Sequence, residues 1–316
     1  MKLTRQQTKE HERVLSLIEA HPPGQHWNHM IECPTCGGKG ASHCEECDRD
    51  GLVNVLHYIF DHFHPGYHRD ISRCANFFTP RNDAVAVAQA GGAGGRVIEP
   101  TAGIGSIAHA VYSLNCWGGD AEPPLKLTCV ELVEDFVAIG RKLVPQAEWI
   151  CGNIFDVLPT LGEFDSFVAN PPFGKLPSNQ SKTWGDDIAF GIIQELLPRC
   201  HNGGIVILPA GHHAQSANMR NGECERGRFA DGPSSKFNRF KKLNPAWAIQ
   251  PTSFGCSNQW KGTSIECEIV DVCRDETYEP EVPEAELTPE PVSIDTKPSP
   301  QPALAIPDSR DPWANL

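Results

Sequence analysis

Apolar positions along the chain follow two different periods, and the change between them divides the sequence into two parts. Residues 4–20 and 52–64 carry apolar side chains at helical spacing. From about residue 83, short apolar runs such as "RVIE", "LKLTCVE", "FDSFVAN" and "GGIVILP" alternate with segments that have helical periodicity. Strands that alternate with helices are typical of right-handed βαβ units. We therefore predict two N-terminal helices followed by an α/β fold with a parallel sheet. The apolar positions of the second helix are Leu52, Val55, Leu56, Ile59, Phe60 and Phe63.

The last two apolar runs differ from the others because no helical segment separates them. These are "AWAIQPTSF" and "TSIECEIVDV". Two consecutive strands without a crossover helix favour antiparallel pairing. We expect them at one edge of the sheet.

Charge is unevenly distributed over the 316 residues, whose formal net charge is −13. The segment from Asp275 to Leu316 holds ten acids against Lys297 and Arg310, so it contributes −8 and leaves −5 for the rest. This segment is rich in Pro and Glu and poor in aromatic residues, a composition that cannot offset its ordering entropy by burial. We expect a disordered tail that solvates the protein or binds a protein partner.

Composition also restricts the cellular context. No apolar run reaches the roughly 18 residues of a membrane span, and the N-terminus is charged and amphipathic. The count of 13 cysteines is odd, and several stand singly in apolar runs, which favours reduced thiols over a disulfide framework. We expect a cytoplasmic protein with no membrane partner, of the kind that bacterial and phage genomes encode.

The segment "VIEPTAGIGSIAHA", residues 97–110, predicts a strand, a glycine loop and a helix that together contact a ligand. Gly103 and Gly105 allow close approach to the backbone, and the helix N-terminus supplies donors. A dinucleotide fingerprint requires a third glycine where Ala108 stands. Glu99 disfavours a pyrophosphate and favours a cationic or zwitterionic ligand. The alternative is an ordinary turn between strand and helix.

Polar residues follow the next predicted strands as well. Glu131 ends one strand, where a carboxylate can accept both hydroxyls of a ribose. Asn153 and Asp156 follow another strand, where they can bind an adenine amino group, and Asn170 follows a fourth. Ligands of such sheets bind at the carboxyl ends of the strands, so these groups are expected to converge on one crevice.

The stretch "FVANPPFGK", residues 167–175, ends a strand with two prolines. Proline has no backbone donor and a fixed φ, so we expect the carbonyls of Asn170 and Pro171 to point outward, with Phe173 beside them. Such a pocket is rigid and rich in acceptors. The alternative is a simple turn that terminates the strand.

Taken in order, "FFTP" (77–80), "EPTAGIGS" (99–106), "VELVEDF" (130–136), "GNIFDVL" (152–158) and "NPPF" (170–173) resemble the S-adenosylmethionine-dependent methyltransferases that modify adenine N6 in DNA. The resemblance covers about residues 67–273 and implies a Rossmann-like, seven-stranded methyltransferase sheet. Residues 1–66 then form an N-terminal region, and residues 274–316 the tail. The family carries Asp where this chain has Asn153.

The resemblance implies roles for individual residues. Phe77, Thr79 and Pro80 contact the methionine part of the cofactor, and Glu131 holds its ribose. The side-chain oxygen of Asn170 and the carbonyl of Pro171 accept the hydrogens of the target amine, and the base is flipped out of the duplex to stack on Phe173. The expected catalytic residues are Asn170, Pro171, Pro172 and Phe173. The expected cofactor site comprises Phe77, Thr79, Pro80, Glu99, Thr101, Gly103, Gly105, Glu131, Asn153 and Ile154.

Four cysteines in the segment "CPTCGGKGASHCEECDRDG" have the spacing of a zinc site. They form the pattern C-x2-C-x7-C-x2-C, and the glycines between them permit tight turns. The first half resembles the zinc repeats of J-domain chaperones, whereas the second half lacks one of the two glycines. His43 is an alternative ligand. We expect a structural Zn²⁺ held by Cys33, Cys36, Cys44 and Cys47, in a knuckle over residues 31–51 that docks substrate or a partner.

One region of the chain outside the pocket is a candidate for contact with nucleic acid. Residues 218–243 hold seven Lys or Arg against three acids, interleaved with Phe229, Phe237 and Phe240. A solvated helix face explains this composition equally well. The loop after the NPPF motif adds Lys175, Lys182 and Trp184, and His212 and His213 follow the fifth strand.

Three functional hypotheses follow. The first is methyl transfer from S-adenosylmethionine to adenine N6 in DNA. The second keeps the pocket but changes the substrate to an adenine or guanine amino group in RNA, or to a protein glutamine. The third is a non-catalytic nucleic-acid-binding protein that uses the zinc knuckle.

Overall fold

The structure is a computed structural model. It describes residues 5–21, 29–40, 44, 46–47, 49–63, 78–91, 94–115, 126–174, 187–209, 218–220, 223–225, 235–257 and 267–278. Several residues that the sequence singles out lie outside the described residues: His43, Phe77, Lys175, Lys182, Trp184, His212, His213, Phe229 and the tail from residue 279.

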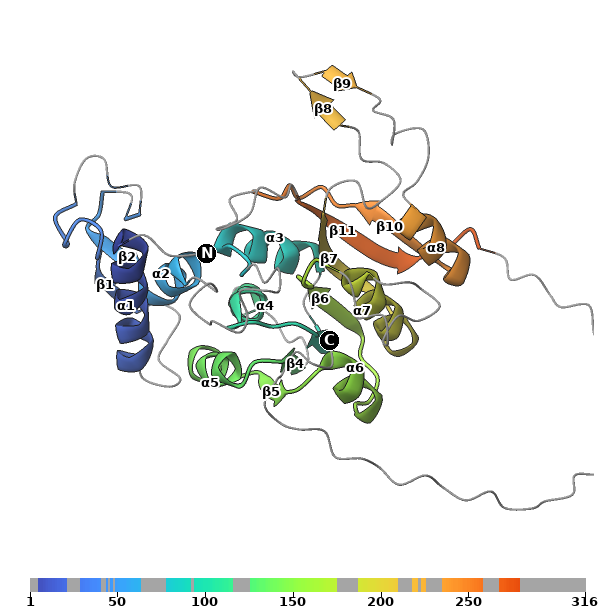
Figure 1. Ribbon diagram of the computed structural model, residues 1–316, viewed down its shortest axis with the longest axis horizontal. Coiled ribbons are helices and arrows are strands. Elements are labelled where there is room, and N and C mark those ends of the chain that lie inside the picture. The colour runs from blue at the N-terminus through green and yellow to red at the C-terminus, as the bar shows by residue number, and fades with distance from the viewer. Residues whose placement is uncertain are drawn as a thin grey trace, which may run out of the picture.

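Seven strands form one mixed sheet in the order β10-β11-β7-β6-β3-β4-β5 (Figure 1). Strands β3 to β7 are parallel, whereas β11 is antiparallel to both of its neighbours, β7 and β10. This arrangement confirms the predicted α/β fold, a Rossmann-like sheet of seven strands, and its antiparallel edge pair. The strands are β3 (Arg96–Glu99), β4 (Lys126–Glu131), β5 (Glu148–Cys151), β6 (Ser166–Ala169), β7 (Gly204–Pro209), β10 (Trp247–Pro251) and β11 (Cys267–Arg274).

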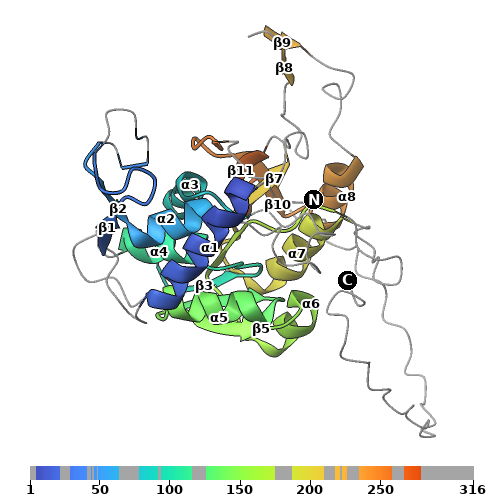
Figure 2. The ribbon, with the colours of Figure 1, turned by 60° about the vertical axis from the view of Figure 1, so that its left-hand side comes forward.

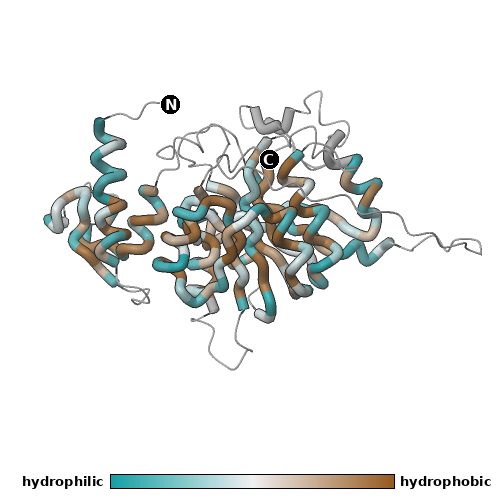
Figure 3. The backbone as a smooth tube through the Cα atoms, turned by 60° about the horizontal axis from the view of Figure 1, so that its bottom comes forward, coloured by the Kyte–Doolittle hydropathy of each residue, from teal (hydrophilic) through white to brown (hydrophobic). Residues whose placement is uncertain are grey.

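Helices cover both faces of this sheet (Figures 1 and 2). Helices α3, α4 and α5 lie on one face, and α6, α7 and α8 on the other. Successive strand residues point to opposite faces, so each face has its own buried cluster: Ile205 and Ile207 of β7 enter one, Val206 and Leu208 the other. Figure 3 shows this apolar centre between polar outer surfaces. The helices are α3 (Arg81–Gly91), α4 (Ser106–Asn115), α5 (Glu134–Leu143), α6 (Ile154–Val157), α7 (Ile188–Leu196) and α8 (Ser235–Leu243).

Four short elements are also described in this part of the chain. Single 3-10 turns extend α6 over Leu158–Thr160 and α7 over Leu197–Arg199. Strands β8 (Asn218–Arg220) and β9 (Glu223–Glu225) pair as a separate antiparallel ribbon, which the sequence did not predict.

The N-terminal part contains α1 (Arg5–Ala20), β1 (Met30–Glu32), β2 (Leu52–Asn54) and α2 (Val55–His62). The prediction of a helix over 52–64 is wrong at its start, because residues 52–54 pair with β1 as an antiparallel ribbon. Asn54 fixes the boundary: its side chain accepts from the amides of Leu56 and His57 at 3.0 and 3.2 Å and caps α2. Leu52 is accordingly 46% exposed instead of facing the core.

The N-terminal elements pack onto the same face of the sheet as α3 to α5. Val14 of α1 and Ile59 of α2 are buried in the cluster that also contains Ile205 and Ile207. Lys142 of α5 donates to the carbonyl of Glu19 at the end of α1, at 2.6 Å. One core is therefore shared between the N-terminal part and the sheet.

Candidate active site

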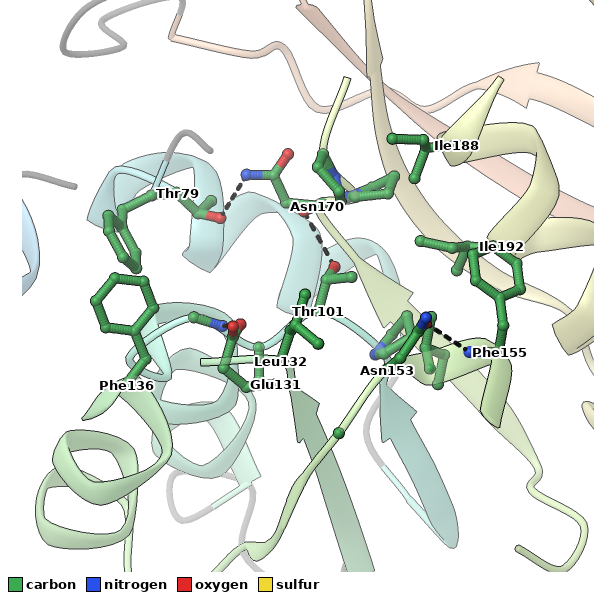
Figure 4. Close-up of a pocket in the computed structure, with 18 of the residues that line it drawn as sticks. Thr79, Thr101, Glu131, Leu132, Phe136, Asn153, Phe155, Asn170, Ile188 and Ile192 are labelled. Atoms are coloured by element: carbon green, nitrogen blue, oxygen red, sulfur yellow. Dashed lines mark hydrogen bonds between the residues drawn. The ribbon is translucent and has the colours of Figure 1, made fainter. Parts of the chain in front are cut away.

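The carboxyl ends of β3, β4, β5 and β6 open into one pocket (Figure 4). This is the convergence that the parallel order of the strands predicts. Nine of the residues expected from the sequence line this pocket: Thr79, Thr101, Gly103, Glu131, Asn153, Ile154, Asn170, Pro171 and Pro172. The remaining lining residues are Phe78, Pro100, Ala102, Ser106, Leu132, Phe136, Gly152, Phe155, Ile188 and Ile192.

Gly103 brings the loop after β3 against an aromatic ring and a carboxylate. Its φ of +56° is a conformation that favours glycine, and a Cβ at this position would lie 2.8 Å from the ring of Phe78. The amide of Gly103 donates to Glu131 Oε2 at 2.8 Å, and the amide of Val133 donates to Glu131 Oε1 at 2.9 Å. The glycine loop and the end of β4 are thereby joined at the pocket wall.

Glu131 is the only charged side chain among the described residues that line the pocket. Burial raises the pKa of its carboxyl, while the amides of Val133 and Gly103 act in the opposite direction. Each carboxylate oxygen has a second lone pair, so the two backbone bonds leave acceptor capacity toward the pocket. A carboxylate without a basic neighbour in the lining favours a cationic or zwitterionic ligand over a phosphate.

Glu99, to which the sequence analysis gave that electrostatic role, does not line the pocket. The residue is 1% exposed, and Cys129 Sγ, on the neighbouring strand β4, donates to its Oε2 at 3.9 Å. Burial raises the pKa of this carboxyl well above its usual value, and the charge of Glu131 acts in the same direction. The carboxylate that lines the pocket is therefore that of Glu131, one strand away.

Asn153 begins helix α6. Its side-chain oxygen accepts from the amide of Phe155 at 3.1 Å, which satisfies a donor at the helix N-terminus (Figure 4). That oxygen keeps a second lone pair and the side-chain amide nitrogen is a donor, so Asn153 has both an acceptor and a donor for a ligand. The expected contact with an adenine amino group stays a prediction.

Asn170 is held through both its main chain and its side chain (Figure 4). Thr101 Oγ1 donates to the main-chain carbonyl of Asn170 at 3.2 Å, and Asn170 Nδ2 donates to Thr79 Oγ1 at 3.0 Å. The expectation that the Asn170 carbonyl points outward as an open acceptor is wrong. Because β3 and β6 pair in parallel, the residues that follow them are neighbours, and the hydroxyl of Thr101 reaches this carbonyl.

Three other expected residues lie outside the pocket lining. A Cβ on Gly105 would meet the ring of Trp149 at 3.1 Å, so this glycine permits packing of α4 and β5. Phe173 is partly buried against the core of the sheet face that carries α3 to α5. Pro80 accepts from the amide of Ala84 at 2.9 Å and begins α3.

An aromatic cluster behind the pocket was not expected from the sequence. Phe78 and Phe136 line the pocket with ring centroids 5.1 Å apart, in an edge-to-face arrangement. Phe63, at the end of α2, lies 5.0 Å from Phe78 and 5.9 Å from Phe136. Both pocket phenylalanines fall within motifs that the sequence analysis quoted, but only the fold brings Phe63 to them. The N-terminal part thus supports one wall of the pocket.

The four predicted metal ligands lie together in the N-terminal part. All sulfur atoms of Cys33, Cys36, Cys44 and Cys47 are within 4.8 Å of one another, and two of the distances, Cys33 to Cys44 and Cys36 to Cys47, are 3.7 Å. Zinc bound to four thiolates at about 2.3 Å gives sulfur–sulfur distances of about 3.8 Å. The arrangement fits a tetrahedral ion that is closed to other ligands.

Backbone geometry explains how the two halves of this knuckle make similar turns with different residues. Gly40 and Gly51 have positive φ, and a Cβ on either would lie 2.4 Å from a backbone oxygen, that of Arg49 or Gly38. Arg49 has the same left-handed conformation with φ of +73°, and among the described residues it is the only non-glycine that does. It stands where the first half of the motif has Gly38. The second half therefore keeps the turn without the glycine.

Side chains connect the knuckle to the helices beside it. His62 of α2 lies between two carboxylates: its Nε2 is 2.9 Å from Glu46 of the knuckle, and its Nδ1 is 3.6 Å from Glu10 of α1. The hydroxyl of Tyr58 also donates to Glu10. These contacts fix the orientation of the knuckle on α1 and α2.

Helix α8 presents part of the basic region. Arg239 and Lys242 are exposed on it, whereas Lys241 pairs with Asp275 at 3.1 Å. Phe240, an expected base contact, is 2% exposed and packs against Phe190 with centroids 5.6 Å apart. That expectation is wrong, because Phe240 anchors the helix in the core. In the part of the chain that the structure describes, no helix is long and apolar enough to cross a membrane.

Comparisons with known proteins give structural similarity alone. No family model and no curated protein sequence matches the chain. Among solved structures, a modification subunit attributed to a type I restriction enzyme of Vibrio vulnificus YJ016 is 15% identical with a TM-score of 0.47, covering 72% of this chain and 51% of that one. The methyltransferase subunit of a type I restriction-modification system from Streptococcus thermophilus is 15% identical with a TM-score of 0.45, covering 75% and 51%.

A third similar structure is a Listeria monocytogenes protein attributed to the class I S-adenosylmethionine-dependent methyltransferases. It is 10% identical with a TM-score of 0.43, and the match covers 88% of this chain and 91% of that one. The present chain spans about half the length of the two type I subunits.

Proposed function

We propose that this protein transfers the methyl group of S-adenosylmethionine to the exocyclic N6 amino group of adenine in DNA. The observation that carries the proposal is that Asn170, at the end of β6, shares one pocket with the glycine loop and with Glu131. A strand-terminating turn alone does not account for the two hydrogen bonds that orient Asn170.

The pocket fits this cofactor in three respects. Gly103, which has no Cβ, lets the loop after β3 pack against Phe78 in the pocket wall and leaves its backbone open to close approach. Glu131 supplies a carboxylate to ribose hydroxyls, and the lining offers it no basic partner. Ser106, the first residue of α4, is 7% exposed, and its hydroxyl has no hydrogen-bond partner among the described residues although it borders the pocket. A buried hydroxyl without a partner costs about 1–3 kcal/mol, so a polar ligand group there is favourable.

The cofactor, when bound, supplies an electrophilic methyl group activated by a positively charged sulfur. The contribution of the chain is to position the amine and increase its reactivity. Oδ1 of Asn170 and the carbonyl of Pro171 accept its two hydrogens, which favours a tetrahedral nitrogen whose lone pair is less delocalised into the base. Pro171 and Pro172 fix the backbone that carries these acceptors.

DNA is proposed as the substrate on two grounds. The order of the motifs is that of the DNA adenine methyltransferases the sequence resembles, and α8 presents Arg239 and Lys242 to solvent at the edge of the molecule. The flipped base would enter the pocket between Asn170 and the aromatic wall.

The experiment is transfer of a labelled methyl group by purified protein to duplex DNA, single-stranded DNA, ribosomal RNA and a protein extract. We expect N6-methyladenine in DNA, and a loss of about 100-fold or more in Asn170→Ala, the range found when one group that stabilises a transition state is removed. Label found only in RNA or protein contradicts DNA as the substrate but remains consistent with methyl transfer from this pocket. If the protein neither transfers a methyl group nor binds the cofactor, the result contradicts the proposed enzymatic activity and supports a non-catalytic binding protein.

We also propose that Cys33, Cys36, Cys44 and Cys47 hold one structural Zn²⁺. The sulfur–sulfur distances of 3.7 Å support this, as does the closed coordination by four protein ligands. Elemental analysis is expected to give one zinc per chain. Protein with full cofactor affinity and without bound metal contradicts the proposal.

A further inference from the structure

Thr79 contacts Asn170 from a distant part of the chain. The two residues are 91 positions apart, and Asn170 Nδ2 donates to Thr79 Oγ1 at 3.0 Å (Figure 4). Thr79 is 6% exposed, so this bond is shielded from competition by water. The hydroxyl that the resemblance assigned to the cofactor is engaged with the asparagine.

The orientation of the Asn170 carboxamide decides which group it offers to a ligand. Its two ends have similar size, but the nitrogen is a double donor and the oxygen an acceptor. A primary amine presents two N–H donors, so it is recognised by the oxygen and repelled by the nitrogen. Because Nδ2 is turned toward Thr79, the opposite end of the carboxamide, Oδ1, is the one that can accept from an amine.

The position of Thr79 is itself fixed. Pro80 follows it and restricts it to extended conformations, and the Pro80 carbonyl accepts from Ala84 in the first turn of α3. Helix α3 is held at that end by Asp83, which accepts from the amide and the hydroxyl of Ser257 at 2.6 and 2.8 Å. The hydroxyl of Thr79 therefore projects from a rigid support.

A second threonine, Thr101, forms a hydrogen bond with the main chain of Asn170. Thr101 Oγ1 donates to the carbonyl of Asn170 at 3.2 Å and ties the loop after β3 to the loop after β6. Thr101 thus fixes the backbone position of Asn170, and the bond to Thr79 restrains rotation of its side chain.

We propose that Thr79 is a positioning residue that keeps the acceptor end of Asn170 toward the substrate amine. This inference rests on the proposed methyl transfer. It assigns the role of Thr79 to the turnover step and not to cofactor affinity.

The test compares Thr79→Val, which keeps the shape and removes the hydroxyl, with Thr79→Ser, which keeps the hydroxyl. For Thr79→Val we expect kcat to fall about tenfold, with the cofactor Kd and the melting temperature unchanged, and for Thr79→Ser a kcat within about threefold of wild type. An increased cofactor Kd with unchanged kcat overturns the inference and restores the cofactor role. Equal kcat in all three proteins also overturns it.

A second measurement does not depend on activity. The side-chain amide signals of Asn170, identified by their absence from the nitrogen–proton correlation spectrum of Asn170→Ala, report the bond to Thr79 directly. We expect faster exchange with water and a changed shift in Thr79→Val, and near wild-type signals in Thr79→Ser. Unchanged signals in Thr79→Val contradict the inference. If wild type transfers no methyl group, the proposed function fails, and these signals still decide whether Thr79 holds Asn170.

A double-mutant cycle tests the orientation itself. In Asn170→Asp both ends of the side chain are acceptors, so no orientation is wrong for an amine. We expect Thr79→Val to change kcat by less than about threefold in that background. A full tenfold effect there shows that Thr79 acts in another way and contradicts the inference.

Discussion

The pocket and the cysteine knuckle differ in how far along the chain their parts are separated. The knuckle takes its four sulfur atoms from residues 33–47, whereas the pocket takes its polar groups from the ends of four strands and joins residues as far apart as Thr79 and Asn170. Ligand identity in the knuckle follows from local spacing. In the pocket, the role of each residue depends on neighbours that only the sheet order supplies.

The two regions are linked through the end of α2. His62 pairs with Glu46 of the knuckle, and the next residue, Phe63, packs against Phe78 and Phe136 of the pocket wall. One part of the comparison is therefore open to experiment: whether the knuckle and the pocket are independent, or whether the N-terminal part stabilises the pocket. Four predictions address this, in order of decreasing effect.

Removal of a metal ligand is expected to have the largest effect. In Cys36→Ser, or after chelation, the knuckle loses a contribution on the order of 10 kcal/mol from zinc binding, so residues 30–54 unfold locally. Hydrogen exchange measured by mass spectrometry should show loss of protection there and retained protection in β3 to β7. Cys273→Ser on β11 is the control and should match wild type. Unchanged protection over residues 30–54 contradicts the metal site.

Truncation of Phe63, which packs against both phenylalanines of the pocket wall, is expected to have the next largest effect. Phe63 is 4% exposed, and Phe63→Ala should lower the free energy of unfolding by about 3–5 kcal/mol. Because Phe78 and Phe136 lose their support, cofactor affinity should fall as well. Chemical denaturation and calorimetric titration measure the two effects. Leu52→Ala, at an exposed site, is the control; a Phe63→Ala protein with normal cofactor affinity shows that the regions are independent.

Gly103→Ala should act on the pocket alone. The positive φ costs about 1–3 kcal/mol for a residue with a Cβ, and that Cβ collides with Phe78, so we expect cofactor Kd to rise about tenfold or more. Gly255→Ala is the matched control, because a Cβ there meets no atom within 4 Å. Equal cofactor affinity in the two variants contradicts the placement of the ligand against the glycine loop.

The smallest expected effect is a gain in the stability of the knuckle. Arg49 occupies a left-handed conformation that glycine adopts without strain, so Arg49→Gly should stabilise the knuckle by about 1 kcal/mol. Slower release of zinc to a chelator measures this, with Asp50→Gly as the control for loss of a side chain. Faster zinc release from Arg49→Gly than from wild type contradicts the turn geometry.

The sequence predicted the sheet class and the antiparallel edge pair because apolar periodicity and crossover helices are local signals. It located Glu131, Asn153 and Asn170 because each follows a buried strand. It placed Glu99 in the pocket, which Glu99 does not line, since a strand-end acid has the same sequence signal whether it lines a pocket or is buried away from it. It also missed Asn54 as a helix cap, so residues 52–54 were assigned to the helix instead of the ribbon.

Contacts between distant residues account for the remaining differences. Phe240 lies in a basic segment with aromatic residues, which is typical of nucleic-acid contacts, yet it is a core residue. Its contact with Phe190 of α7 decides between the two roles, and the sequence does not show that contact. The bonds of Asn170 to Thr79 and Thr101 follow from the placement of α3 and β3 beside β6, which no local pattern encodes.

A crystal structure of the protein with S-adenosylhomocysteine tests the central claim most directly. We predict one molecule in the strand-end pocket, with its ribose hydroxyls on Glu131, its backbone contacts at Gly103, and the Asn170 side chain still bound to Thr79. A ligand bound elsewhere, or a pocket filled by the chain's own side chains at saturating ligand, would contradict the assignment of this pocket to methyl transfer.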